Sequence, residues 1–168
     1  MSSLWTRAEL EEATSGRFLP ALPPATAAKS STTTGNGAVT GISIDTRTLA
    51  PGDLFIALKG DTSDGHAHVQ AALDKGAACA MVHATDGLAD PRVLVVADTM
   101  VGLPHLALAA RARLGGRVVA VTGSVGKTTT KAILRLCLRA NGLTPAAEAS
   151  YTNHCAVPLT PATLPPRA

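Results

Sequence analysis

The residues with the clearest chemical potential lie in the run 122–130, which reads Thr-Gly-Ser-Val-Gly-Lys-Thr-Thr-Thr. Its two glycines allow the backbone to curl so that successive N–H groups point inward at phosphate oxygens. The helix expected to follow adds the positive end of its dipole. The run therefore predicts a nucleotide-phosphate site formed by Gly123, Ser124, Val125, Gly126, Lys127, Thr128 and Thr129.

Two side chains of this loop have specific expected roles. Lys127 is expected to reach the transferred phosphoryl oxygens as the catalytic cation, and the Thr128 hydroxyl is expected to ligate Mg²⁺. The loop has the short form Gly-x-x-Gly-Lys-Thr, because Val121 stands where the general phosphate-loop pattern has its first glycine. An ordinary strand-to-helix turn is the alternative interpretation, which the Lys-Thr-Thr sequence disfavours. The expected cofactors are ATP and Mg²⁺.

Strand-like and helix-like segments alternate along the chain, which predicts an α/β fold with a largely parallel sheet. A capping box at Thr6 and Glu9 starts the first helix, and we expect Gly16 to end it in a left-handed turn. The Pro51-Gly52 pair predicts a type II turn. The expected strands are 39–44, 54–58, 78–82, 93–97 and 118–121, and the expected helices are 6–14, 66–75, 102–114 and 128–140, with Pro104 in the first turn of the third.

Composition divides the chain into two expected units. Residues 1–101 form a small N-terminal α/β domain, within which 20–38, rich in Pro, Ala, Ser, Thr and Gly, predict a flexible loop. Residues 102–168 begin a phosphate-loop domain with a Rossmann-like parallel sheet. One strand and one helix cannot cover both faces of such a sheet, so we expect this second domain to be truncated. The proline-rich run 157–168 is not expected to complete it.

Charge and composition exclude several function classes. Apolar residues make up 46% of the chain and charged residues 16%, which excludes a disordered tail. Residues 1–100 carry 7 basic and 11 acidic side chains (7 − 11 = −4), whereas residues 101–168 carry 8 basic and 1 acidic (8 − 1 = +7). The basic half favours a small phosphorylated ligand over nucleic acid, because no basic run is interleaved with stacking aromatics and no helix-turn-helix or zinc-finger spacing is present. We expect no membrane insertion, and three cysteines without metal-ligand spacing indicate reduced thiols in the cytoplasm.

The loop, preceded by Val-Ala-Val-Thr, resembles that of the Mur ligases and folylpolyglutamate synthetases, which are ATP-dependent amide-forming enzymes. Upstream, Ser-Ile-Asp-Thr-Arg at 43–47, the run 51–60 and Asp-Gly-His at 64–66 favour the Mur branch and make the folate type the weaker match. They are similar to the domain that holds the UDP end of a muramyl-peptide substrate. The resemblance implies substrate contacts by Ser43, Thr46, Arg47, Asp64, Gly65, His66 and Asn153.

Lys131 and the runs 149–154 and 157–160 favour the family member that adds D-alanyl-D-alanine to UDP-MurNAc-tripeptide through an acyl phosphate. The resemblance implies that further catalytic parts lie beyond residue 168, namely an acidic Mg²⁺ ligand, a carbamylated lysine and a C-terminal domain. It also implies that this stretch alone is inactive and that the full-length enzyme is a monomer. Two alternatives stay open: a sister ligase that adds the third residue, and a non-catalytic nucleotide-binding remnant.

Structural alternatives also stand beside several candidate residues. An ion pair with Asp45 or Asp53 is the alternative for Arg47, and turn capping is the alternative for Ser43, Thr46 and Asp64. Spacing argues against a metal pair of His66 and His68, because residues two apart on a helix point to different faces. Cys137 is expected in a core, and Lys131, Arg135 and Arg139 on a solvated helix face.

Overall fold

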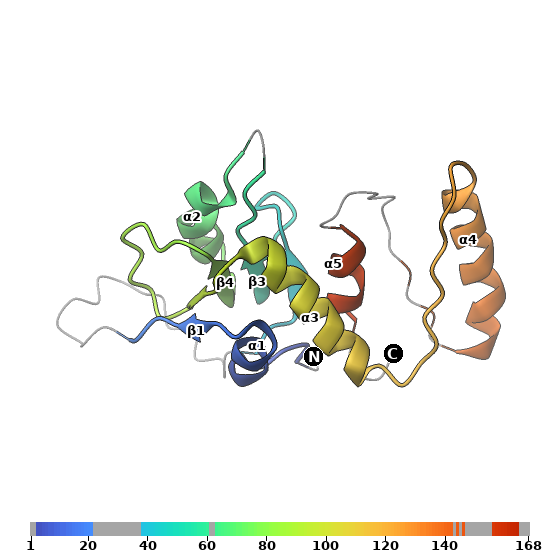
Figure 1. Cartoon of the computed structure of the whole chain (residues 1–168), viewed down its shortest axis with the longest axis horizontal. Coiled ribbons are helices and arrows are strands. Elements are labelled where there is room, and N and C mark those ends of the chain that lie inside the picture. Colours follow the sequence, from blue (N-terminus) through green and yellow to red (C-terminus); the bar gives the residue numbers. More distant parts are fainter. Residues whose placement is uncertain are drawn as a thin grey trace.

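The computed structural model describes residues 3–21, 38–60, 63–142, 144, 146 and 156–164 (Figure 1). Within them the chain forms a five-stranded sheet in the order β1-β5-β4-β3-β2. The predicted loop at 20–38 falls almost entirely outside the described residues. The strands are β1 (Arg17–Phe18), β2 (Gly41–Ser43), β3 (Asp53–Ile56), β4 (Cys79–Val82) and β5 (Val93–Val95).

Strands β2 to β5 are all parallel, with Ile42 opposite Leu54 and Phe55 opposite Ala80. The predicted α/β class with a parallel sheet is confirmed. The short strand β1 was not predicted, and it adds an antiparallel edge beside β5. Because the four parallel strands run the same way, their carboxyl ends meet at one edge of the sheet, which is where open α/β sheets bind ligands.

The helical elements connect and cover these strands. Helix α1 begins after Thr6 with the predicted capping box, but it ends at Ser15 in the left-handed conformation (φ 55°), so the expectation for Gly16 is wrong. Helix α3 begins at Thr99 because the Asp98 carboxylate accepts the Met100 N–H, which places Pro104 inside the helix rather than in its first turn. The elements are α1 (Arg7–Thr14), η2 (Gly65–His68), α2 (Val69–Asp74), α3 (Thr99–Arg113), α4 (Lys127–Leu138), η3 (Arg139–Asn141) and α5 (Ala156–Ala162).

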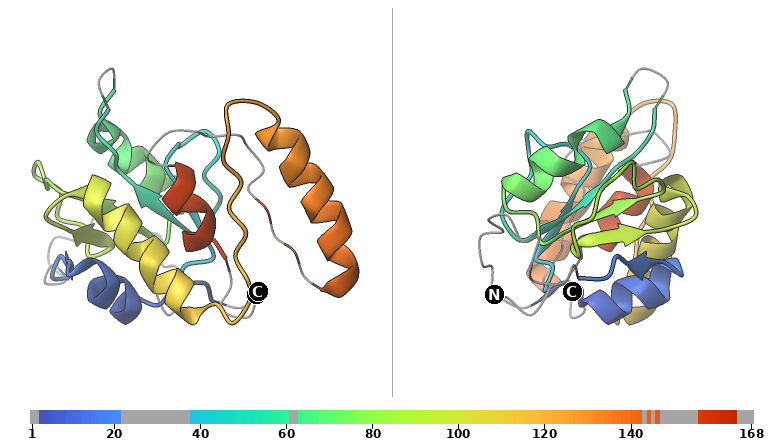
Figure 2. Two further views of the ribbon diagram at one scale, coloured as in Figure 1. Left: turned by 45° about the vertical axis from the view of Figure 1, so that its right-hand side comes forward. Right: turned by 90° about the vertical axis from the view of Figure 1, so that its left-hand side faces the viewer.

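The sheet is covered on both faces, as a parallel sheet requires. Figure 2 shows α2 on one side of the sheet and α1 with α3 on the other. Along β3 the side chains alternate between the two cores: Leu54 and Ile56 pack in the cluster that includes Leu103 of α3, whereas Phe55 packs in the cluster that includes Val69 of α2. Leu54, Phe55 and Ile56 are all buried, so β3 is packed on both of its faces.

Helix α5 packs along α3, far from it in sequence (Figure 1). The Trp5 indole Nε1 donates to the carbonyl of Ala162 at 3.0 Å, and the Arg113 guanidinium lies 3.7 Å from the centre of the Trp5 ring. Arg113 also donates to a carboxylate oxygen of Glu9 at 3.1 Å. The N-terminal segment, the end of α3 and the end of α5 therefore meet around one buried indole.

The segment before α4 differs from its prediction. Residues 118–121 are extended but have no strand partner among the described residues, and Val118 and Val119 are more than half exposed. Helix α4 buries none of its side chains, and Cys137 is exposed rather than in a core. A strand needs a neighbour to accept its ladder bonds, and the described part of the chain offers none here. Figure 1 shows α4 standing apart from the sheet.

Thr99 provides a test of the packing between α3 and the sheet. Its side chain is fully buried, and its hydroxyl donates to the Ala57 carbonyl at 2.8 Å. The change Thr99→Val keeps the shape but leaves that carbonyl unpaired, which typically costs about 1–3 kcal/mol of unfolding free energy. Urea unfolding followed by the emission of Trp5, the single tryptophan of the chain, measures the loss.

Thr163→Val is the matched control, because the Thr163 hydroxyl also donates to a backbone carbonyl but is exposed. We expect the control to change the unfolding free energy by less than about 0.5 kcal/mol. Equal effects of the two substitutions would contradict the assigned role of Thr99.

Candidate functional site

The phosphate loop adopts a curled backbone at the start of α4. Gly123 and Gly126 have φ angles of 143° and 80°, which favour glycine. Gly126 is the residue before the helix, and the Thr130 N–H donates to its carbonyl at 2.9 Å. The helix begins at Lys127, one residue earlier than expected. The N-terminal end of the helix therefore follows the loop directly, the arrangement that anion sites at helix N-termini use.

The side chains of this loop are open to solvent. The Lys127 ammonium donates to the Gly123 carbonyl, so the lysine folds back over its own loop. Val125 is 91% exposed, and Ser124, Thr128 and Thr129 are exposed as well. No acidic side chain lies in the first turn of α4. The local charge is thus positive and accessible, which suits a phosphate group.

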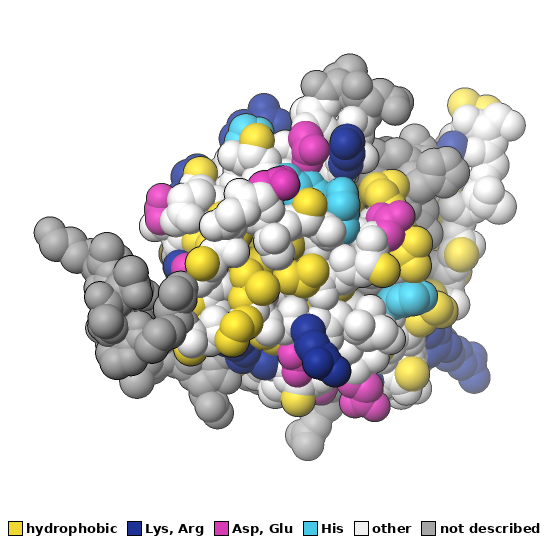
Figure 3. Space-filling model, turned by 60° about the vertical axis from the view of Figure 1, so that its left-hand side comes forward, with side chains coloured by type: hydrophobic (Ala, Val, Ile, Leu, Met, Phe, Trp, Pro, Cys, Tyr) yellow, Lys and Arg dark blue, Asp and Glu magenta, His cyan; other side chains and the backbone are white. Residues whose placement is uncertain are grey.

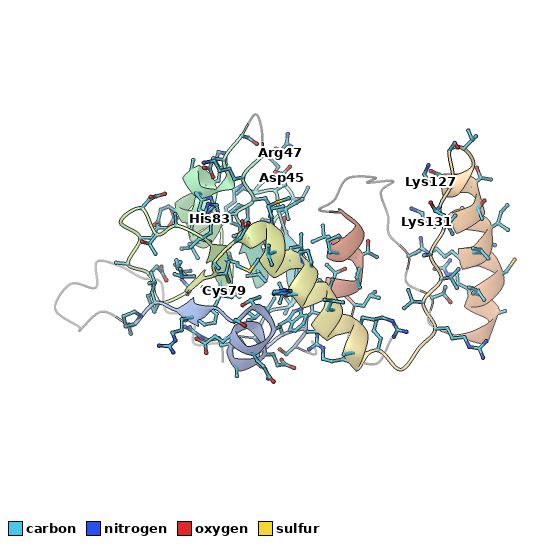
Figure 4. The ribbon with its side chains drawn as sticks, in the orientation of Figure 1. Asp45, Arg47, Cys79, His83, Lys127 and Lys131 are labelled. Carbon is cyan, nitrogen blue, oxygen red and sulfur yellow. The ribbon has the colours of Figure 1, made fainter. Side chains whose placement is uncertain are left out.

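Lys131 follows Lys127 by one helical turn. Figure 4 shows both labelled side chains on the side of α4 that faces the extended segment before it. Spacing of four residues places them on one face. The predicted solvated face holds for Arg135 and Arg139, which are exposed, whereas Lys131 is half-buried.

A second group of candidate residues follows β2 at the carboxyl edge. Ser43 is buried, and its hydroxyl donates to the Asp45 carbonyl at 2.9 Å. Thr46 is half-buried, and its carbonyl accepts a hydrogen bond from the Lys75 ammonium at 2.8 Å. Turn capping, the alternative for Ser43, is what the structure shows. The loop that contains Thr46 is held against the end of α2.

Arg47 forms the ion pair expected as its structural alternative. Its Nε lies 3.0 Å from both Asp45 carboxylate oxygens and its Nη2 lies 2.6 Å from Oδ2. The Arg47 side chain hydrogen bond lowers the pKa of Asp45 to about 2. The partner is Asp45 and not Asp53, whose carboxylate accepts the Ala50 N–H. The Arg47 side chain is 87% exposed, so solvent and anions reach the guanidinium.

Asp64, Gly65 and His66 form a tight turn after β3. The Asp64 Oδ1 atom accepts the His66 backbone N–H at 2.9 Å and contacts the imidazole Nδ1 at 2.7 Å. These hydrogen bonds from His66 lower the pKa of Asp64. A Cβ atom on Gly65 would lie 2.9 Å from backbone atoms of Leu58, so only glycine fits. Asp64 therefore caps the turn, and Gly65 allows the close approach of the β3 end.

Sequence reasoning missed a polar network that continues from His66. The His83 backbone N–H donates to His66 Nε2 at 3.2 Å, and the two rings meet edge to face at 4.1 Å. His83 Nδ1 lies 3.4 Å from the Thr99 hydroxyl. Because His66 comes from η2, His83 follows β4 and Thr99 begins α3, only the packing of these elements brings them together. Sequence spacing carries no signal for this contact.

A cavity of about 390 Å³ lies beside this network. Figure 3 shows histidine and acidic side chains gathered on one face of the molecule. Arg47 pairs with Asp45, whereas Asp64 contacts His66 and Lys59. Asn153 lies outside the described residues. The cavity is lined by Asp64, His66, Ala67, Gln70, Ala84, Asp86 and Leu88.

The described residues contain no group of three or more His, Cys, Asp or Glu side chains arranged to hold a metal ion. The Thr128 hydroxyl, the predicted Mg²⁺ ligand, lies on an exposed residue in the first turn of α4. In the described part of the chain, no helix is both long and apolar enough to cross a membrane.

Comparison with known proteins assigns the chain to a family. Residues 38–119 match the model of the Mur ligase family, catalytic domain. The UDP-N-acetylmuramoyl-tripeptide–D-alanyl-D-alanine ligases of Synechocystis and Bacillus subtilis are 39% and 37% identical over 124 and 127 residues, which are 73% and 74% of this chain. Those alignments cover 27% and 28% of the relatives, so the chain spans little more than a quarter of their length.

Solved structures agree with these relatives. A crystal structure of MurF from Acinetobacter baumannii matches with a TM-score of 0.73 and 32% identity, covering 98% of this chain and 34% of that one. The MurF ligase of Thermotoga maritima in complex with ADP matches with a TM-score of 0.61 and 30% identity, over 74% of this chain and 29% of that one. The fold, the phosphate loop and the sequence likeness lead to one conclusion: the chain belongs to the Mur ligase family.

Proposed function

We propose that the chain contains the substrate-binding region and the phosphate loop of a ligase that joins D-alanyl-D-alanine to UDP-MurNAc-tripeptide at the expense of ATP. The observation that carries this proposal is the curled loop from Gly123 to Lys127 at the start of an exposed helix. The names of the relatives support the choice of substrates. Residues 1–101 would hold the UDP-linked substrate, and residues 102–168 would begin the nucleotide-binding unit.

The chemistry of amide formation explains why both regions are needed. A carboxylate has no leaving group, so ATP first phosphorylates it to an acyl phosphate, and the incoming amine then displaces phosphate. In phosphoryl transfer the protein mainly positions the reactants and supplies positive charge, and it does little covalent chemistry itself. Lys127 would leave the Gly123 carbonyl and bind the β- and γ-phosphate oxygens. The N–H groups of the loop and of the first helical turn would bind the remaining oxygens.

The loop would also supply one of the oxygen ligands of a magnesium ion. Mg²⁺ prefers oxygen ligands and commonly combines one or two protein oxygens with substrate phosphates. Thr128, an exposed hydroxyl next to Lys127, supplies such an oxygen. When bound, the ion would neutralise charge on the phosphates. Thr128 would hold and orient it.

At the carboxyl edge, Arg47 is the candidate for the diphosphate of the UDP group. Its planar guanidinium already binds both oxygens of a carboxylate, with Nε donating to Oδ1 and Nη2 to Oδ2 of Asp45, and this geometry also suits a phosphate. Exposed ion pairs are weak, so an incoming diphosphate can replace Asp45. The free thiols of Cys79 and Cys137 are in keeping with the cytoplasm as the place of this activity.

A sister ligase is the second candidate, favoured by one relative. The UDP-N-acetylmuramoyl-L-alanyl-D-glutamate–2,6-diaminopimelate ligase of Chlorobaculum tepidum is 32% identical over 142 residues. Such an enzyme takes a substrate one residue shorter. Titration of the chain with UDP-MurNAc-tripeptide and UDP-MurNAc-dipeptide, followed by NMR, separates the two: tighter binding of the tripeptide supports the first candidate, and tighter binding of the dipeptide the second.

Replacing Lys127 tests the phosphate loop. We expect Lys127→Ala to weaken binding of MgATP to this chain about tenfold or more, because a hydrogen bond to a charged partner contributes about 1.5–3 kcal/mol. NMR titration measures the dissociation constants. Arg135→Ala removes an equal charge two turns further along α4. We expect its dissociation constant for MgATP to be within about twofold of that of the unchanged chain. If both variants bound alike, the loop would be a structural turn.

Replacing Arg47 tests the carboxyl edge. We expect Arg47→Ala to weaken binding of UDP about tenfold, since the variant loses a charge-assisted fork to the diphosphate. The control is Arg17→Ala, which removes an exposed positive charge from β1 at the far side of the sheet. Isothermal calorimetry with UDP compares the two variants. Equal affinities for Arg47→Ala and the unchanged chain would remove Arg47 from the site.

A further inference from the structure

The polar network at the ends of β3 and β4 determines which atoms a ligand can meet. The His83 backbone N–H donates to His66 Nε2, so that nitrogen carries no proton. The neutral imidazole then carries its proton on Nδ1, which donates to Asp64 Oδ1 at 2.7 Å. Both nitrogens of His66 are therefore used within the protein. Its side chain is 7% exposed, which leaves little of the ring for a ligand.

The network is anchored on the opposite side as well. Thr99 donates its single proton to the Ala57 carbonyl, so its oxygen accepts from His83 Nδ1. This fixes the ring of His83 next to that of His66. The end of β3, the end of β4 and the start of α3 thereby hold His66 in one orientation. A side chain fixed so completely is suited to positioning its neighbour, Asp64.

Asp64 is the member of the network that remains accessible. Its side chain is 43% exposed and lines the cavity of about 390 Å³. Oδ1 accepts both hydrogen bonds from His66, whereas Oδ2 lies 4.0 Å from the Lys59 ammonium. The lowered pKa of Asp64 keeps this oxygen an acceptor at neutral pH. Asp86 also lines the cavity, together with the apolar side chains of Ala67, Ala84 and Leu88.

This chemistry does not suit a phosphate, because two carboxylates repel it. It suits a neutral group with hydrogen-bond donors, and carboxylates in nucleotide sites commonly accept bonds from sugar hydroxyls. We propose that Asp64 accepts a hydrogen bond from a sugar hydroxyl of the nucleotide-linked substrate, and that His66 is a positioning residue that does not touch this substrate. The inference rests on the proposed function. At the carboxyl edge of the sheet, Arg47 would bind the diphosphate and Asp64 would bind the sugar.

Two probes test the proposal on the unchanged chain and its variants by NMR titration: UDP, which contains a sugar, and inorganic pyrophosphate, which does not. In Asp64→Asn the amide oxygen takes the bonds from His66, and a donor replaces the acceptor Oδ2. We expect this variant to bind UDP about tenfold more weakly and pyrophosphate within twofold of the unchanged chain. Asp74→Asn, which removes an exposed charge from α2, is the control and is expected to bind both probes unchanged.

Two substitutions of His66 separate positioning from mere packing. An asparagine amide can take the place of Nδ1, so His66→Asn is expected to bind UDP within threefold of the unchanged chain. A glutamine amide reaches only the position of Nε2, so we expect His66→Gln to lose about as much affinity for UDP as Asp64→Asn does. The imidazole ¹⁵N shifts of His66 are expected to show a proton on Nδ1 alone. A proton on Nε2 would overturn its role as a positioning residue.

The outcomes distinguish the two levels of the proposal. Suppose that the unchanged chain binds UDP, and that Asp64→Asn either weakens the binding of UDP and of pyrophosphate equally or weakens the binding of neither. The proposed sugar contact is then wrong, and the proposed function stands. If the unchanged chain binds neither probe, the proposed substrate region itself fails. The amide spectrum of each variant establishes that it is folded, and equal losses in His66→Asn and His66→Gln would also reject the positioning role.

Discussion

Burial of β3 from both faces is the constraint on which the rest of the structure depends. Leu54 and Ile56 face the core beneath α1, α3 and α5, while Phe55 faces the core beneath α2. A parallel strand in this position must be covered on each side, and α2 on one face and α1, α3 and α5 on the other supply that cover. The carboxyl ends of the strands then meet at one edge, and the candidate residues after β2, β3 and β4 gather there as a result.

Locally encoded features could be predicted from the sequence, and contacts between distant segments could not. The capping box of Thr6 and Glu9 and the turn at Gly52 follow from interactions within four residues, and both are present. The bond between Trp5 and Ala162 joins residues 157 positions apart. Its existence depends on how α5 packs against α3, about which local residue preferences say nothing. The contact of His66 with His83 escaped prediction for the same reason.

The phosphate region shows the same division within one segment. The loop curls because Gly123 and Gly126 take positive φ angles, and this conformation needs no distant partner. The preceding strand was predicted from its run of β-branched residues, but a strand is completed only by a neighbour. Val118 and Val119 remain more than half exposed as extended chain. The curled backbone of the loop is therefore formed without that neighbour, whereas Lys127 donates to the Gly123 carbonyl and would have to leave it to bind a nucleotide.

Charge at the carboxyl edge is arranged so that each part of an extended ligand would meet a different partner. Arg47 is held by Asp45 in a two-pronged ion pair on an exposed loop, and such a pair is weak enough to exchange for a phosphate. Asp64 is held by His66, which is itself fixed by His83 and the start of α3. The cation is therefore exposed and weakly paired, whereas the carboxylate is oriented by two hydrogen bonds from His66. A diphosphate has many equivalent oxygens, so an exposed cation can bind it in several ways, whereas a sugar hydroxyl donates in one direction and is bound best by an acceptor with a fixed orientation.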